Sequence, residues 1–249
     1  MPSKVEEIKM NPIEENKNTW NFIAGTNGLH STPIESIPTD SSKIIQQLDP
    51  FNLVDFSSFD RAMLIGAGGG NFSPLYSALG KKVTLIDISS EQLKKDRKVC
   101  RDNKLEVDCI ESSALDIPQL DILPFPYAFM AVCDIYFPSV VELYQAIASK
   151  LLDGAYFYAH LWNPVWMQVK ENQITFPSKE GFMQEIKEED GLHSTYQHIH
   201  PIEFLFGGLC DVGFEIIKIK ASKSDRYKND RITPAYHVLA RKASTSICR

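Results

Sequence analysis

Alternating glycines at the end of a short apolar run constrain this chain more than any other feature. The run Met63-Leu64-Ile65 leads into the turn Gly66-Ala67-Gly68-Gly69-Gly70, and a second apolar run ends at Asp87, 17 residues after the turn. A strand, a glycine turn, a helix and a strand ending in an acid form the entry unit of a doubly wound α/β sheet. Glycine has no Cβ, so a ligand can approach its backbone closely. The segment therefore predicts a site for an adenosine-type cofactor, with the acid on the ribose.

Length and charge narrow the function classes. The chain has 249 residues, of which 43% are hydrophobic and 23% are charged, and its net charge is −6. These values fit one globular α/β domain. A negative chain without basic runs disfavours nucleic acid or an anionic membrane surface as a partner. We therefore expect a small-molecule substrate and a monomer or homodimer.

The termini and cysteines predict a cytoplasmic protein. The first ten residues are charged and lack the apolar core of a signal peptide. The longest apolar stretch, residues 122–133, is too short to span a membrane and contains Pro124 and Pro126. Five scattered cysteines without a C-x-x-C pair indicate reduced thiols, neither a disulfide framework nor a zinc site.

The pattern along the chain predicts an N-terminal extension, residues 1–60, on a core domain of residues 61–249 that carries an insertion at 162–200. Short helices are expected at 13–23 and 42–48 of the extension. In the core domain strands and helices alternate, which indicates a mostly parallel sheet. The predicted strands are 63–65, 83–86, 106–111, 129–134, 155–160, 214–221 and 236–242, and the predicted helices are 73–79, 90–103, 140–152 and 201–210. Asp153-Gly154 is predicted to stop the third of these helices.

Six segments in order make residues 58–243 resemble the class I S-adenosylmethionine-dependent methyltransferases. They are the glycine turn, Val83–Ser89, Ser113–Pro118, Tyr127–Asp134, Leu152–Ala155 and Gly213–Glu215. The resemblance implies a Rossmann-like, doubly wound, seven-stranded sheet with a C-terminal antiparallel hairpin, in which the last strand lies between the fifth and sixth. It also implies S-adenosylmethionine as the cofactor.

The resemblance implies a set of cofactor-binding residues: Gly66, Ala67, Gly68, Gly70, Asp87, Ile88, Ser113, Ala114 and Asp134. Asp134 is an alternative candidate for an ordinary helix cap. Two positions depart from the family pattern, which commonly has acids where this chain has Leu64 and Ser113. Recognition of the methionine amine must therefore come from elsewhere, and adenine would be read by a backbone amide.

Candidate catalytic residues are His160, His198 and Tyr136. His160 ends the fifth strand at the ligand edge of the sheet, His198 precedes the last helix, and Tyr136 follows the fourth strand beside the expected sulfonium. Each histidine has a purely structural alternative. His198 and His200 lack further ligands in sequence for a metal site, so we expect none. His30 lies in a turn-rich segment that we expect near the site.

The combined expectation is a transferase that methylates the oxygen or nitrogen of a small molecule by in-line displacement. The nearest alternative transfers or cyclises the aminocarboxypropyl arm of the same cofactor and releases methylthioadenosine. A third reading is a cofactor-binding module without catalysis. An NAD-dependent dehydrogenase is a weaker reading, because asparagine follows the glycines where G-x-G-x-x-G needs glycine.

Overall fold

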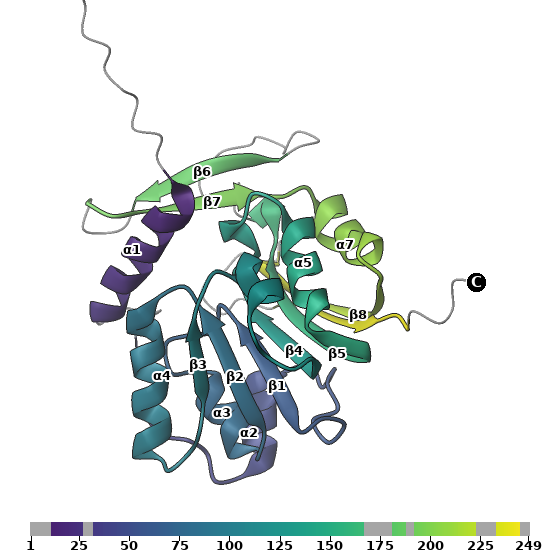
Figure 1. Cartoon of the computed structure of the whole chain (residues 1–249). Coiled ribbons are helices and arrows are strands. Elements are labelled where there is room, and N and C mark those ends of the chain that lie inside the picture. Colours follow the sequence, from purple (N-terminus) through teal and green to yellow (C-terminus); the bar gives the residue numbers. More distant parts are fainter. Residues whose placement is uncertain (1–10, 27–31, 167–180, 188–191, 223–232, 245–249) are drawn as a thin grey trace, which may run out of the picture.

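A seven-stranded sheet in the order β3-β2-β1-β4-β5-β9-β8 forms the centre of the computed structural model (Figure 1). The structure describes residues 11–26, 32–166, 181–187, 192–222 and 233–244. Strands β1 to β5 are parallel, whereas β9 runs antiparallel to both β5 and β8. The sheet strands are β1 (Arg61–Ile65), β2 (Lys82–Asp87), β3 (Asp108–Glu111), β4 (Phe125–Ala131), β5 (Leu151–Trp162), β8 (Phe214–Ala221) and β9 (Ala235–Lys242). The predicted topology, including the last strand between the fifth and sixth, is confirmed.

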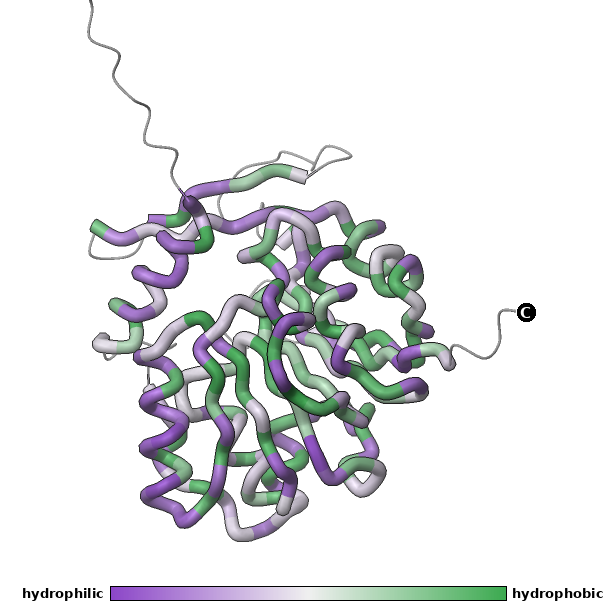
Figure 2. Tube along the Cα trace, in the orientation of Figure 1, coloured by the Kyte–Doolittle hydropathy of each residue, from purple (hydrophilic) through white to green (hydrophobic). Residues whose placement is uncertain are grey.

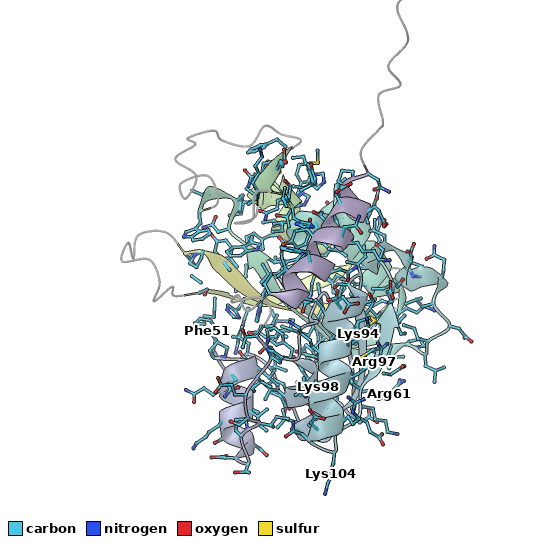
Figure 3. The ribbon with its side chains drawn as sticks, turned by 90° about the vertical axis from the view of Figure 1, so that its left-hand side faces the viewer. Phe51, Arg61, Lys94, Arg97, Lys98 and Lys104 are labelled. Atoms are coloured by element: carbon cyan, nitrogen blue, oxygen red, sulfur yellow. The ribbon has the colours of Figure 1, made fainter. Side chains whose placement is uncertain are left out.

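Helices pack against apolar side chains on both faces of the sheet. On one face lie α5 (Val140–Ser149) and α7 (Ile202–Asp211), and on the other α2 (Ser41–Leu48), α3 (Ser73–Ala78) and α4 (Ser90–Asp102). Side chains alternate between faces along each strand, so Met63 and Ile65 join the first core while Ala62 and Leu64 join the second. The hydropathy colouring follows this arrangement, with green strands and a mainly purple α4 (Figure 2), and Lys94, Arg97, Lys98 and Lys104 lie along the outer side of that region (Figure 3).

Side-chain caps define where several helices begin. Ser89 Oγ accepts from the Gln92 amide at the start of α4, and Ser139 Oγ accepts from the Glu142 amide at the start of α5, both at 3.2 Å. The prediction for Asp153-Gly154 is wrong, because α5 ends at Ser149 and β5 has already begun. Gly154, at φ +78°, lies where the pairing of β5 with β4 shifts register. The glycine therefore accommodates a bulge inside the strand.

The extension and the insertion meet above the carboxyl ends of the parallel strands. Helix α1 (Pro12–Gly25) and the antiparallel hairpin of β6 (Phe182–Lys187) and β7 (Ser194–Ile199) lie on the side toward which β1 and β2 point (Figure 1). Asn16 joins them: its Nδ2 donates to the Tyr196 carbonyl at 2.9 Å and its Oδ1 accepts from the Tyr196 amide at 2.7 Å. The two helices that the sequence predicts in the extension are confirmed, and they are α1 and α2. Sequence patterns did not reveal the hairpin.

Candidate active site

Backbone amides of the glycine turn donate to carboxylates of the protein itself. Gly68 N donates to Asp87 Oδ2 at 2.9 Å, while Gly69 N and Gly70 N both donate to Asp96 Oδ2, at 2.7 and 3.0 Å. A phosphate-binding turn offers free backbone amides to the anion. The Gly68, Gly69 and Gly70 amides already donate to Asp87 and Asp96, so they are not free for a pyrophosphate, which disfavours a dinucleotide.

Asp87 lies at the end of β2 with acceptor capacity to spare. Its Oδ1 accepts from the Ser89 amide at 2.9 Å and its Oδ2 from the Gly68 amide at 2.9 Å, and a carboxylate offers about four acceptor positions in all. Burial raises the pKa of this carboxyl, and the amide donors act against that rise. A Cβ on Gly68 would lie 2.7 Å from Asp87 Oδ2. Any side chain at Gly68 would therefore collide with the Asp87 carboxylate, so this position requires glycine.

The turn after β3 lies beside the same carboxylate. The Ser112 amide donates to the Asp87 carbonyl at 3.1 Å, and Ser113 Oγ accepts from the Leu115 amide at 3.3 Å. Ala114 is buried, whereas Ile88 is half-buried. The fold thus brings together the segments predicted to contact ribose and adenine.

The chain turns sharply after β4 and carries Asp134 into the protein. Val132 has φ +44°, which is strained for a β-branched residue, and such strain concentrates at functional sites. A Cβ on Gly66 would meet the Cys133 side chain at 2.7 Å, so this turn packs directly on the glycine turn. Asp134 is fully buried, and neither carboxylate oxygen has a hydrogen-bond partner among the described residues. Burial raises the pKa of Asp134 to about 7.

Residues of β7 face Asp134 across a small cavity. Asp134, Trp162, His198 and His200 line this space of about 10 Å³, the size of one water molecule. Within the described chain, His198 Nε2 is buried without a hydrogen-bond partner, and burial lowers its pKa. His200 Nε2 lies 3.2 Å from the Asp134 carbonyl oxygen. Tyr136 follows in the short helix η2 (Asp134–Tyr136), with its ring edge-to-face with Trp20 of α1.

His160 lies on β5 among aromatic side chains. Its ring is 4.9 Å from that of Phe129 and 4.1 Å from that of His237, its partner in register on β9. Its Nε2 is buried and has no hydrogen-bond partner in the part of the chain that the structure describes. Burial holds the pKa of His160 well below its usual value, so the ring is neutral near pH 7. The structure therefore brings Asp134 and His198 together at one cavity, with Tyr136 two residues after Asp134 in η2, whereas Tyr136 and His160 do not line that cavity; His30 lies outside the described residues.

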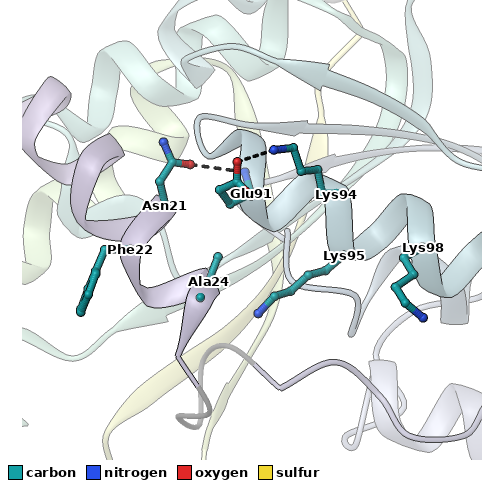
Figure 4. Close-up of a pocket in the computed structure, with 8 residues that line it drawn as sticks. Asn21, Phe22, Ala24, Glu91, Lys94, Lys95 and Lys98 are labelled. Carbon is teal, nitrogen blue, oxygen red and sulfur yellow. Dashed lines mark hydrogen bonds and ion pairs between the residues drawn. The ribbon is translucent and has the colours of Figure 1, made fainter.

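Helix α1 closes over the ends of β2 and β3. Asn21 Oδ1 lies 2.8 Å from Ser89 Oγ and 3.3 Å from the Glu91 amide, and Lys17 pairs with Glu111 at 2.9 Å. Between α1 and α4 lies an open hollow of about 500 Å³, lined by Asn21, Phe22 and three lysines of α4 (Figure 4). Glu91 pairs with Lys94 there at 2.5 Å. This hollow lies beside the cap of α4, outside the Asp134 cavity.

Two features of the site escaped the sequence analysis. Asp96 and His237 lie 26 and 77 residues along the chain from Gly70 and His160, which they contact at the site. The sequence offers a weak indication of each. Asp96 is a carboxylate in the helix that follows Asp87, and His237 is a histidine within a mainly apolar final strand. Among the described residues no cluster of three metal-ligating side chains occurs, and no helix combines the length and apolarity needed to cross a membrane.

Comparisons with known proteins agree with this geometry. The family described as "Methyltransferase domain" matches residues 63–159. An uncharacterized methyltransferase, YbaJ of Bacillus subtilis (strain 168), is 22% identical over 137 residues, which are 55% of this chain and 49% of that protein. The chain thus spans about half the length of this curated relative.

Solved structures share the fold. A putative S-adenosylmethionine-dependent methyltransferase from Listeria monocytogenes has a TM-score of 0.62 at 15% identity, covering 82% of this chain and all of that one. The N-methyltransferase NodS from Bradyrhizobium japonicum WM9, in complex with S-adenosyl-L-homocysteine, has a TM-score of 0.62 at 10% identity, covering 92% and 100%.

The fold and the glycine turn define a Rossmann-like α/β domain. Residues 63–159 match the methyltransferase-domain family, and the chain shares its fold with solved S-adenosylmethionine-dependent methyltransferases. The residues present fit S-adenosylmethionine, because the Gly68, Gly69 and Gly70 amides already donate to carboxylates and are not free for a phosphate, and the buried Asp134 carboxylate, without a hydrogen-bond partner among the described residues, follows the turn that packs on Gly66.

Proposed function

We propose that this protein transfers the methyl group of S-adenosylmethionine to an oxygen or nitrogen of a small molecule. The observation that carries the proposal is the buried carboxylate of Asp134, which lacks a hydrogen-bond partner among the described residues and lies beside the glycine turn. A buried charge without a partner is costly. A positively charged or hydrogen-donating ligand at this place would remove that cost.

Two groups of residues would hold the cofactor. Gly66, Ala67, Gly68 and Gly70 would let the backbone approach it, and Asp87 would accept from the ribose hydroxyls. Ile88, Ser113 and Ala114 would border the adenine, and Asp134 would face the positively charged end. When bound, S-adenosylmethionine supplies an electrophilic methyl group.

The acceptor side would lie among Tyr136, His198 and His160. Methylation of a hydroxyl or amine releases one proton from the acceptor atom, and a neutral imidazole nitrogen can take it. Burial lowers the pKa of both His198 and His160, and the Nε2 of each has no partner in the described chain, so each can accept a proton at that atom. The remaining catalysis is positioning of the acceptor and exclusion of water beneath α1 and the hairpin.

Product analysis tests this function directly. Purified protein is incubated with S-adenosylmethionine and a panel of small hydroxyl, carboxyl and amine compounds, and nucleoside products are separated. S-adenosylhomocysteine formed only with an acceptor supports the proposal. Methylthioadenosine would instead indicate transfer of the aminocarboxypropyl arm, and absence of both products despite cofactor binding would indicate a binding module.

A matched pair of histidine variants then identifies the proton acceptor. His198→Ala should lower turnover about a hundredfold, in the range of general base catalysis. The control is His193→Ala, since His193 lies just before β7 and stacks on Phe22 at 3.9 Å, away from the Asp134 cavity. If both variants retain full turnover, the same measurement on His160→Ala decides whether the other candidate carries the proton.

A further inference from the structure

Asp96 of α4 is a fully buried carboxylate that has no part in the function proposed above. It is 0% exposed and joins three segments of the chain. Its Oδ2 accepts from the Gly69 and Gly70 amides, and its Oδ1 accepts from Ser73 Oγ at the first residue of α3. One side chain therefore fixes the second half of the glycine turn, the start of α3 and the second turn of α4 relative to each other.

The backbone that Asp96 holds is unusual. Gly69 and Gly70 have φ values of +107° and +79°, a conformation that other residues rarely adopt. A Cβ on Gly70 would meet Pro33 at 3.0 Å and Val99 at 3.1 Å, so the turn is also closely enclosed. Glycines in such a conformation lose much entropy on ordering. The two amide bonds to one carboxylate oxygen offset that loss.

The proposal rests on the proposed cofactor site. We infer that Asp96 is a positioning residue, which holds the Gly69–Gly70 half of the turn so that Gly66, Gly68 and Asp87 present a preformed surface to the cofactor. Asp96 itself is fully buried, and both of its carboxylate oxygens already accept hydrogen bonds from the protein, so it holds the turn without binding the cofactor. Its removal should therefore weaken cofactor binding by disordering the turn, with the binding groups themselves unchanged.

The protonation state of Asp96 does not undo this role. Burial raises its pKa to about 7, and the nearby charge of Asp87 acts in the same direction, while Ser73 and the two amides oppose it. A carboxyl protonated on Oδ1 would donate to Ser73 Oγ, and Oδ2 would still accept from both amides. Asparagine has the same donor and acceptor arrangement, so Asp96→Asn is a conservative rescue variant.

A second buried carboxylate provides the control for a purely structural role. Asp49, 2% exposed, accepts hydrogen bonds from the Leu53 and Val54 amides and so resembles Asp96 in burial and bonding. It precedes β1 and its described hydrogen bonds include none to the glycine turn. Asp49→Ala and Asp96→Ala should both lower the free energy of unfolding.

The experiment measures the dissociation constant for S-adenosylhomocysteine by calorimetry, and unfolding by urea, for the full-length chain and its variants. We expect Asp96→Ala to bind about tenfold more weakly, Asp96→Asn to stay within about threefold of the unchanged protein, and Asp49→Ala to bind normally. A folded Asp96→Ala protein with unchanged affinity, or an Asp96→Asn protein as weak as Asp96→Ala, would overturn the inference.

If Asp96→Ala does not fold, Ser73→Ala decides. It removes only the hydroxyl that orients Oδ1 and should weaken binding about threefold; unchanged affinity would count against the positioning role. Failure of the unchanged protein to bind S-adenosylhomocysteine would contradict the proposed function itself, which separates the two outcomes.

Discussion

Around the glycine turn, the carboxylate of Asp87 at the end of β2 and the buried carboxylate of Asp96 on α4 accept hydrogen bonds from backbone amides, whereas after β4 the carboxylate of Asp134 accepts none among the described residues. In the first region, the carboxylates and the backbone amides of the turn are already hydrogen-bonded to each other. The second leaves the carboxylate oxygens of Asp134 and Nε2 of His198 without a hydrogen-bond partner in the described part of the chain.

This difference indicates how the two regions divide the work. Preformed hydrogen bonds fix the shape of the turn, so ligand binding there costs little ordering. Unpaired buried groups raise the free energy of the unliganded protein, and a ligand that pairs them gains affinity. We therefore expect the turn to set cofactor affinity and the Asp134 region to respond to charge, pH and acceptor.

The largest effect should come from Gly68→Val. A Cβ there lies 2.7 Å from Asp87 Oδ2 and 2.9 Å from Gln92 Cβ, so the side chain would displace the Asp87 carboxylate, which we propose accepts from the ribose, and would occupy the space proposed for the cofactor. Affinity for S-adenosylhomocysteine should fall by about a hundredfold or more. Gly207→Val in α7 is the control, since a Cβ at Gly207 meets nothing within 4 Å. Normal binding by Gly68→Val would mean that the segment is only a turn.

Asp87→Ala should have the next largest effect. It removes charge-assisted hydrogen bonds, each contributing about 1.5–3 kcal/mol, so affinity should fall at least about tenfold in calorimetry. Asp108→Ala, at an exposed carboxylate of the neighbouring β3, should bind as the unchanged protein does. An unchanged dissociation constant in folded Asp87→Ala protein would remove the adenosine site from the end of β2.

Asp134 should make stability depend on pH. Its pKa is raised to about 7 in the folded protein from 3.8, so the folded state holds a proton that the unfolded state has released between these values. This contribution is present below about pH 4 and is lost as pH rises through 7. Asp134→Asn should remove it and be stabilised by about 2 kcal/mol relative to the unchanged protein at pH 8.

Urea unfolding at pH 5.5 and 8 checks this prediction. The pH dependence that remains in Asp134→Asn should combine a part from Asp96, whose pKa is also about 7, with an opposite part from the buried histidines, whose lowered pKa values make the folded state less stable as pH falls. Saturating S-adenosylmethionine should reduce the loss at pH 8 if its positive charge pairs with Asp134. Equal pH dependence in the unchanged and Asp134→Asn proteins would contradict the assigned burial of a free carboxylate.

The smallest effect on cofactor binding should come from loosening α1 from the β6–β7 hairpin, which together lie above both regions. Asn16→Ala removes both bonds between α1 and Tyr196 of β7, which together contribute about 1–2 kcal/mol. Trypsin should then cleave after Lys187 several times faster, while cofactor affinity changes little. The control is Asn103→Ala, at the exposed end of α4. An unaltered cleavage rate would show that α1 does not secure the hairpin.

Local patterns in the sequence predicted the order of elements, the sheet class and the cofactor-facing segments. The turn of Gly66–Gly70 needs conformations that only glycine adopts readily, and Asp87 ends a strand, so both features are visible in short windows. The mostly parallel sheet follows from alternating strands and helices, whereas the final hairpin and the place of its last strand were implied by the resemblance to the methyltransferases. Boundaries shifted where tertiary pairing extended an element, as when β5 took in Leu151–Gly154, for which a helix end had been predicted.

Only the tertiary structure decided which polar groups meet. Asp96 reaches the glycine turn from a later helix, Asn16 pairs with the backbone of Tyr196 180 positions away, and His160 meets His237 through strand register. The sharp turn before Asp134 uses a positive φ at Val132. A positive φ is usually signalled in the sequence by glycine, and this position has valine instead. Sequence determines such contacts only through the packing of the whole chain, because a hydrogen bond depends on positions within a few tenths of an ångström that no local pattern records.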